Sequence, residues 1–118
     1  MALPGPCLTD KPNFNEFDVL LCPAFGRAAL PRMEDGVRWD RQVQVGDLTV
    51  AHDELLFWSG VICGFHLPSS VAPFARSRDS LPIGVRVVAR PYGNRTTIAV
   101  AGLVEALQGG FVPPPNWM

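Results

Sequence analysis

The sequence predicts an α/β fold in which a few strands of a mixed sheet are flanked by two helices. Three observations point to this class. An alternating strand at 83–90 is followed by an apolar helix at 96–108, a short apolar run at 19–21 ends near a proline, and an amphipathic segment begins at Asp53. With 118 residues and 47% hydrophobic side chains, the chain has the length and composition of one globular domain.

The strand at 83–90 and the helix after it give the clearest pattern. One face of the strand carries Ile83, Val85, Val87 and Ala89, and the other carries Gly84, Arg86, Val88 and Arg90. Past its first turn, the helix has two strongly polar side chains, Glu105 and Gln108. A helix this apolar is normally buried on most sides. We therefore expect it to lie at the edge of something larger than this chain alone can cover.

The other elements follow from local signals. We expect a strand over 14–21 that is buried on both faces and a hairpin at 42–50 around Gly46-Asp47. A helix should open at Asp53-Glu54, and a short strand should cover 69–74. Asn94 or Thr96 should cap the last helix, and Gly109 with Gly110 should end it.

Composition excludes several classes of function. The net charge is −1 and the basic residues form no stripe, so the sequence does not predict nucleic-acid binding. No apolar run is long enough to span a membrane. Three scattered cysteines predict a reducing compartment, the cytoplasm, with Cys63 as a small buried hydrophobe. No phosphate loop, dinucleotide motif or convergent metal-ligand set is present, so we expect no cofactor.

Three blocks of sequence carry a resemblance to a known family. They are F-D-V-L-L-C-P at 17–23, W-S-G at 58–60 leading to L-P and V-A-P at 67–73, and L-P-I-G-V-R-V-V at 81–88 followed by G-G-F-V-P-P-P at 109–115. In this order they resemble the C-terminal end of amidase-signature enzymes, hydrolases of amide C–N bonds. The family's domain has a central mixed sheet with helices on both faces. The expected organisation is an irregular leader at 1–13, a partial amidase-like domain at 14–112 and a Pro-rich tail at 113–118.

The resemblance also implies what this chain lacks. Family members use two serines and a lysine, with a Gly-Ser-rich loop that forms the oxyanion hole. The one lysine here, Lys11, lies in the leader, and Ser69-Ser70 falls in a non-catalytic segment of the family pattern. We therefore assign no catalytic residue. The pattern also has glycine where this chain has Ala75 and Ser80, and glutamine where it has Arg86.

The resemblance suggests three residues for the wall of a substrate pocket. Phe25 lies in the long connection at 24–40, which in the family runs close to the substrate. Phe57 and Trp58 lie on the segment that matches a pocket-lining helix. Each also has a simpler explanation: Phe25 would anchor the loop on the core, and Phe57 and Trp58 would pack within it.

Two hypotheses follow for the whole chain. In the first, it is the C-terminal segment of an amidase-like hydrolase, inactive alone, acting on amides only within a complete enzyme or beside a separately encoded N-terminal amidase half. In the second, it is a non-catalytic interaction module whose apolar surface is covered by a homo-oligomer or a partner chain.

Overall fold

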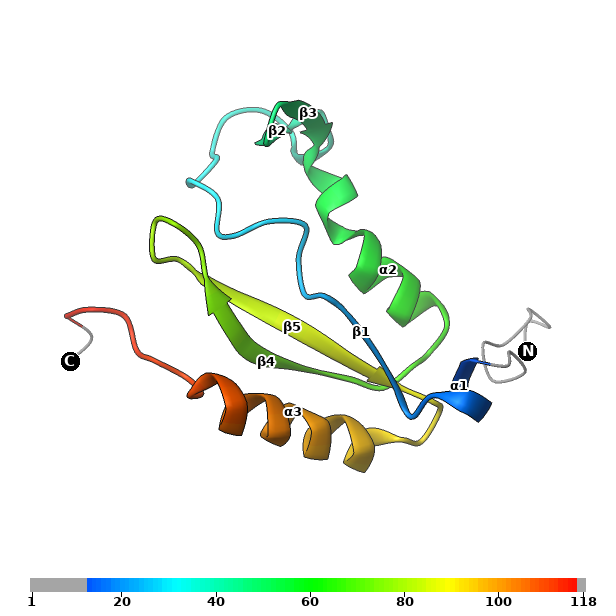
Figure 1. Cartoon of the computed structure of the whole chain (residues 1–118). Coiled ribbons are helices and arrows are strands. Elements are labelled where there is room, and N and C mark those ends of the chain that lie inside the picture. The colour runs from blue at the N-terminus through cyan, green and yellow to red at the C-terminus, as the bar shows by residue number, and fades with distance from the viewer. Residues whose placement is uncertain (1–12, 117–118) are drawn as a thin grey trace.

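The main sheet of the protein has three strands in the order β1-β5-β4 (Figure 1). The computed structural model describes residues 13–116. The strands are β1 (Val19–Pro23), β4 (Ser69–Arg76) and β5 (Pro82–Ala89), and both neighbouring pairs are antiparallel. Helix α2 (Phe57–Gly64) lies on one face of this sheet and helix α3 (Asn94–Gln108) on the other.

The remaining elements are short. They are helix α1 (Asn13–Glu16), the hairpin β2 (Gln42–Val45) and β3 (Leu48–Ala51), and the 3₁₀ helices η2 (Arg38–Asp40) and η3 (His52–Leu56). The hairpin predicted around Gly46-Asp47 is confirmed, and Gly46 takes φ +59°, the sign that the first position of a type II′ turn needs. Asp53 and Glu54 lie in η3, which leads directly into α2.

The α/β class is confirmed, but the sheet is not mixed within the described residues. β4 and β5 are joined by a tight turn near Asp79, and a short connection of this kind forces an antiparallel pair. β1 reaches β5 from far along the chain and also runs antiparallel to it.

The core lies on the side of the sheet that α2 covers. Cys22 from β1, Ile62 from α2 and Val88 from β5 form one buried cluster with Leu67. Trp58 packs against this cluster. On the α3 side, Val87 and Ala89 are fully buried, as expected for the central strand.

The structure corrects two expectations about the first strand. β1 begins only at Val19, because Asn13–Glu16 forms a helical turn. Leu20 and Leu21 are not buried on both faces, and Leu21 is 54% exposed. The reason is position: β1 is an edge strand, with a neighbour on one side only among the described residues.

Helix α3 also differs from its prediction. It is not buried on most sides, and Thr97 is its one buried residue. The outward side exposes three large apolar side chains, Ile98, Leu103 and Leu107. The N-cap is Gly93, without a side-chain cap, so neither Asn94 nor Thr96 has that role. The end at Gly109, with φ +89°, is confirmed.

Two cysteines exchange their expected environments. The prediction that Cys63 is buried is wrong: it lies exposed on α2. Cys22 is the buried thiol, at 5% exposure. Cys7 lies outside the described residues, as do Lys11 and almost all of the expected leader, so the division into leader, domain and tail stays a prediction. No helix within residues 13–116 has the length and apolarity to cross a membrane.

Candidate functional site

Arg86 is the centre of the most polar cluster inside the fold. It extends from β5 toward α2, and its neighbours across the sheet are Cys22 and Val71. Its guanidinium Nη2 donates to Ser59 Oγ at 2.9 Å, and Nη1 donates to Ser69 Oγ at 3.2 Å. The side chain thereby links the central strand to α2 and to β4.

A third contact holds the loop that follows β1. Arg86 Nη2 lies 3.4 Å from the carbonyl oxygen of Ala24, which begins that loop. One cation therefore connects four segments: β4, β5, α2 and the β1 exit. All its acceptors are neutral oxygens, and no described carboxylate lies within ion-pair distance of it.

The Arg86 cluster has unused capacity for an acceptor. Its Nε is buried and donates to no described group. A buried cation without a counter-charge, and with an unpaired donor, is energetically costly in a finished protein interior. Such a site can take a carboxylate, a phosphate or a carbonyl oxygen as an additional partner.

The thiol next to Arg86 is not a nucleophile. Burial raises the pKa of Cys22, while the positive charge of Arg86 acts in the opposite direction and is the weaker effect. A thiol with a raised pKa is protonated at neutral pH, and the thiolate is the reactive form. We therefore assign Cys22 to packing.

The two serines at the start of β4 are engaged in structural hydrogen bonds. Ser69 accepts from Arg86, and Ser70 Oγ lies 2.9 Å from Thr97 Oγ1 on α3. Thr97 Oγ1 also donates to the carbonyl oxygen of Asn94 at 2.8 Å. A nucleophilic serine needs a base that removes its proton. No described lysine, histidine or carboxylate contacts either hydroxyl, so neither serine has the partners of a catalytic group.

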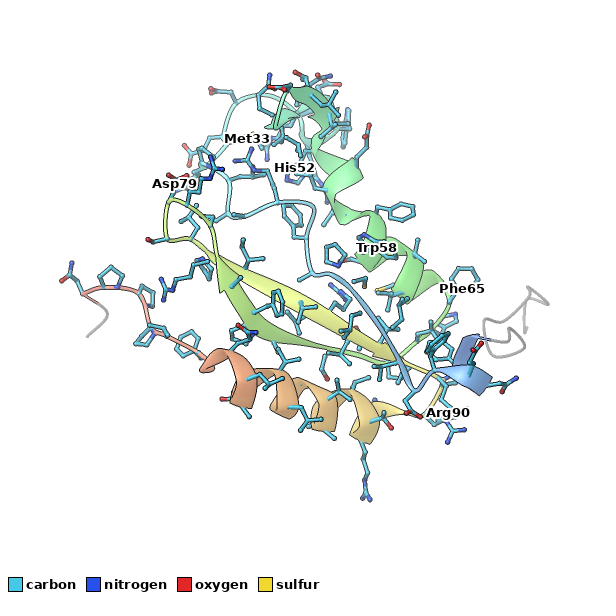
Figure 2. The ribbon with its side chains drawn as sticks, in the orientation of Figure 1. Met33, His52, Trp58, Phe65, Asp79 and Arg90 are labelled. Carbon is cyan, nitrogen blue, oxygen red and sulfur yellow. The ribbon has the colours of Figure 1, made fainter. Side chains whose placement is uncertain are left out.

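Phe57 and Trp58 lie together but face different surroundings. Their rings form an edge-to-face pair with centroids 5.4 Å apart. Trp58 points toward the sheet and packs on the core cluster, whereas Phe57 is 61% exposed (Figure 2). Trp58 is also one residue before Ser59, the partner of Arg86.

Phe25 lies in a different environment from this pair. It is half-buried, and its ring is tilted against His52, with centroids 6.4 Å apart. The next residue, Gly26, donates its N–H to the carbonyl of Leu55 at 3.1 Å, which fixes the loop to η3. A side chain at Gly26 would collide with Leu55, so glycine is needed for this close approach.

A second charged group gathers at η3, on the surface. The carboxylate of Asp53 accepts from His52 Nδ1 and from Arg38 Nε, both at 3.3 Å. The hydrogen bond from His52 lowers the pKa of Asp53, and the charge of Arg38 adds to the effect. The described residues bring no three His, Cys, Asp or Glu side chains together in the manner of a metal site.

Sequence reasoning did not identify Arg86 as the centre of a site. The pattern marked it only as a departure from the resembled family. A usable signal was present, because Arg86 is a charge within an otherwise apolar, alternating strand. Its partners Ser59 and Ser69 come from other elements, and only the fold brings them together.

Comparison with known proteins places local similarity in one group. The chain is 37% identical over 57 residues to human fatty-acid amide hydrolase 2, covering 48% of this chain and 11% of the relative. It is 33% identical over 51 residues to the A-type component of the glutamyl-tRNA(Gln) amidotransferase of Methylocella silvestris, covering 43% of this chain and 10% of the relative. No protein-family profile matches the chain.

A longer match is weaker in identity. The same amidotransferase component from Beijerinckia indica is 26% identical over 100 residues, which is 85% of this chain and 18% of the relative. The chain thus spans between about a tenth and a fifth of the length of these curated relatives. The relatives are amidase-signature proteins, so the similarity points to amidase-like C–N hydrolases.

Proposed function

We propose that this chain is the C-terminal segment of an amidase-like hydrolase of C–N bonds and is inactive alone. One observation carries the proposal most directly. The two positions at which the resembled pattern has glycine, Ala75 and Ser80, are both places where this backbone is irregular. Ser80 takes φ +61°, which a side chain adopts at a cost, and Ala75 follows a shift in the β4–β5 register after Pro73.

This correspondence is more specific than composition. A left-handed residue in a tight turn and an irregularity in an edge strand are the two situations in which glycine is favoured. The chain retains both backbone features although it carries other residues there. Together with the local similarity to amidases, they support a shared local fold for the segment at 67–88.

The proposal assigns the Arg86 side of the sheet to a larger active site. In a complete enzyme, Arg86 would find its missing acceptor in another part of the protein or in an amide carbonyl. Trp58 and Phe57 would form an apolar wall next to it, and Phe25 would contribute from the loop. The chemical step would need a nucleophile, a base and oxyanion donors, which this sequence does not supply.

The test is a search for activity in the purified chain. We expect no hydrolysis of aryl or fatty amides and no labelling by a fluorophosphonate, with a full-length amidase as the positive control. Labelling of the chain that is lost in Ser69→Ala or Ser70→Ala would show that it has its own nucleophile and would overturn the proposal.

A second function is favoured by the exposed side of α3. If the chain is instead a stand-alone interaction module, Ile98, Leu103 and Leu107 would be covered by a second copy or by a partner chain. An N-terminal amidase half is one such partner, and the sparse cysteines favour the cytoplasm as the location. Light scattering decides: a monomeric mass counts against self-association, and recovered activity on mixing with an N-terminal half would establish a split enzyme.

A further inference from the structure

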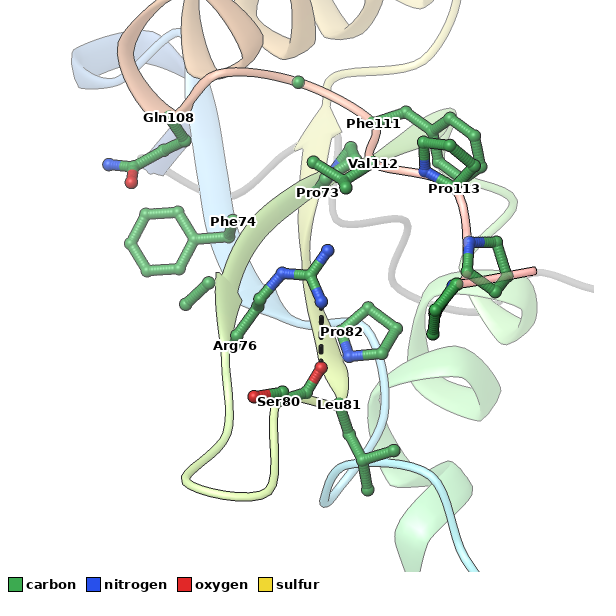
Figure 3. A pocket seen from close by; sticks show the side chains of 14 residues that line it. Pro73, Phe74, Arg76, Ser80, Leu81, Pro82, Gln108, Phe111, Val112 and Pro113 are labelled. Carbon is green, nitrogen blue, oxygen red and sulfur yellow. Dashed lines mark hydrogen bonds between the residues drawn. The ribbon is translucent and has the colours of Figure 1, made fainter. Parts of the chain in front are cut away.

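We propose that a pocket between the β4–β5 hairpin and the C-terminal tail binds a small carboxylate with an apolar or aryl tail. The pocket has a volume of about 480 Å³, which lies within the range of small-molecule sites (Figure 3). It is formed by the end of the hairpin and by the residues that follow α3. This site is separate from the Arg86 cluster, and it does not depend on the function proposed above.

The walls of the pocket are apolar and stiff. Proline rings from both segments line it, among them Pro73, Pro82 and Pro113, and Phe111 adds an aromatic surface. Proline loses no side-chain rotamer freedom when a ligand packs on it, so these walls contribute contact area at low entropic cost. An aryl or branched alkyl group is the part of a ligand that such walls would hold.

The pocket carries a single kind of charge. Among the described residues that line it, Arg76 is the one that is ionised. In the close-up, its guanidinium lies between Phe74 on one side and Phe111 and Pro113 of the tail on the other (Figure 3). Glu105 lies behind Gly110 and does not line the pocket. The charge favours an anionic ligand.

The guanidinium is held in place and still has a free edge. Arg76 Nη1 donates to the carbonyl oxygen of Ser80 at 3.0 Å, which ties it across the hairpin turn. No described group accepts from its Nε or Nη2, and no described carboxylate forms an ion pair with it. The Nε–Nη2 edge matches the two oxygens of a carboxylate.

The backbone geometry that forms this pocket is specific. Gly109 and Gly110 both take positive φ, +89° and +72°, and direct the chain from α3 past the hairpin. Ser80, also at positive φ, aims its carbonyl at Arg76. Three residues in left-handed geometry therefore cooperate in bringing the tail, the turn and the guanidinium together.

The experiment uses the full chain and a matched pair of ligands. Phenylpropanoate is titrated into the ¹⁵N-labelled protein, with phenylpropanamide as the uncharged analogue and inorganic phosphate as an anion without a tail. We expect phenylpropanoate to shift the amide signals of Arg76, Phe111 and Val112. The amide analogue should bind about fivefold more weakly, as for the loss of one partly exposed ion pair. Phosphate should cause no shift at this site.

Variants then test the named groups. Arg76→Gln should weaken phenylpropanoate binding about fivefold and leave phenylpropanamide binding unchanged. Arg78→Gln, a matched change in the same turn outside the pocket lining, should alter neither. The ligand pair tests the charge without any substitution, so misfolding of one variant leaves the test intact. Equal affinity for acid and amide, shifts confined to another surface, or phosphate binding as strong as phenylpropanoate binding would overturn the proposal.

Discussion

Helices α2 and α3 pack on opposite faces of one sheet but treat their apolar side chains differently. The short helix α2 directs Ile62 and Trp58 into the core, and its side of the sheet is closed. The longer helix α3 contacts the sheet mainly through small side chains around Thr97 and exposes large ones such as Leu107. In this chain, hydrophobicity alone does not indicate which helix is buried; the direction of each side chain relative to the sheet decides.

The strongest test of this comparison substitutes one large apolar residue on each helix. Ile62→Ala removes a side chain that is 3% exposed and should lower the free energy of unfolding by about 3 kcal/mol, because it leaves a cavity in the core. Leu107→Ala, at a position 82% exposed, should change it by less than about 0.5 kcal/mol in a monomer. Urea unfolding measures both.

The outcome at Leu107 also reports on assembly. A loss of stability comparable to that of Ile62→Ala, dependent on protein concentration, would mean that the outer side of α3 is buried in an oligomer. The monomeric interpretation of α3 as an exposed helix would then be wrong.

A smaller effect is expected at the polar contact that joins α3 to the sheet. Thr97→Val keeps the shape of a side chain that is 2% exposed but leaves Ser70 Oγ without its partner. We expect a loss of about 1–2 kcal/mol in the free energy of unfolding. Thr96→Val, one residue earlier and exposed, is the control and should be near neutral. If both variants had equal stability, the Ser70–Thr97 contact would contribute nothing.

The smallest effect concerns two thiols, Cys22 in the core beneath α2 and Cys63 on the exposed part of that helix. In a Cys7→Ser background, Cys63 should react with a thiol reagent at least about tenfold faster than Cys22, which is accessible only after local opening. Mass spectrometry of the labelled peptides measures the ratio. Equal rates would mean that the core opens on the α2 side.

The pH dependence has a defined sign. Because the pKa of Cys22 is raised in the folded protein, its contribution to stability is fully present below the ordinary thiol value of 9.0 and is lost as pH rises through the folded pKa. In a Cys7→Ser, Cys63→Ser background, Tm should therefore fall more steeply above pH 9.0 than it does when Cys22 is also replaced by alanine. Identical slopes would contradict the burial of this thiol.

Much of the fold was predictable because local signals and tertiary context agree. The Gly46-Asp47 turn, the strand at 83–90 and the helix end at Gly109 all follow from backbone preferences of a few residues. The misses have tertiary causes. Leu21 reads as buried, and its exposure follows from the edge position of β1, which the strand's own sequence does not encode.

The candidate sites were less predictable than the elements. Arg86 acquires its role from Ser59 and Ser69, which lie 27 and 17 residues away in the sequence. Arg76 similarly depends on a tail that begins after α3. Periodicity assigns a residue to one face of its own element, but it does not reveal which loop or helix will lie over that face.

The two edges of the main sheet are unequal, and this sets a direction for growth. β4 carries Pro73, which has no N–H to offer to an incoming strand, and a register irregularity follows it, so this border resists further pairing. β1 exposes Val19 to Cys22 on its outer side without such a block within the described residues. Any added strand, from a neighbouring molecule or a fibril, would be admitted at β1 and turned away at β4.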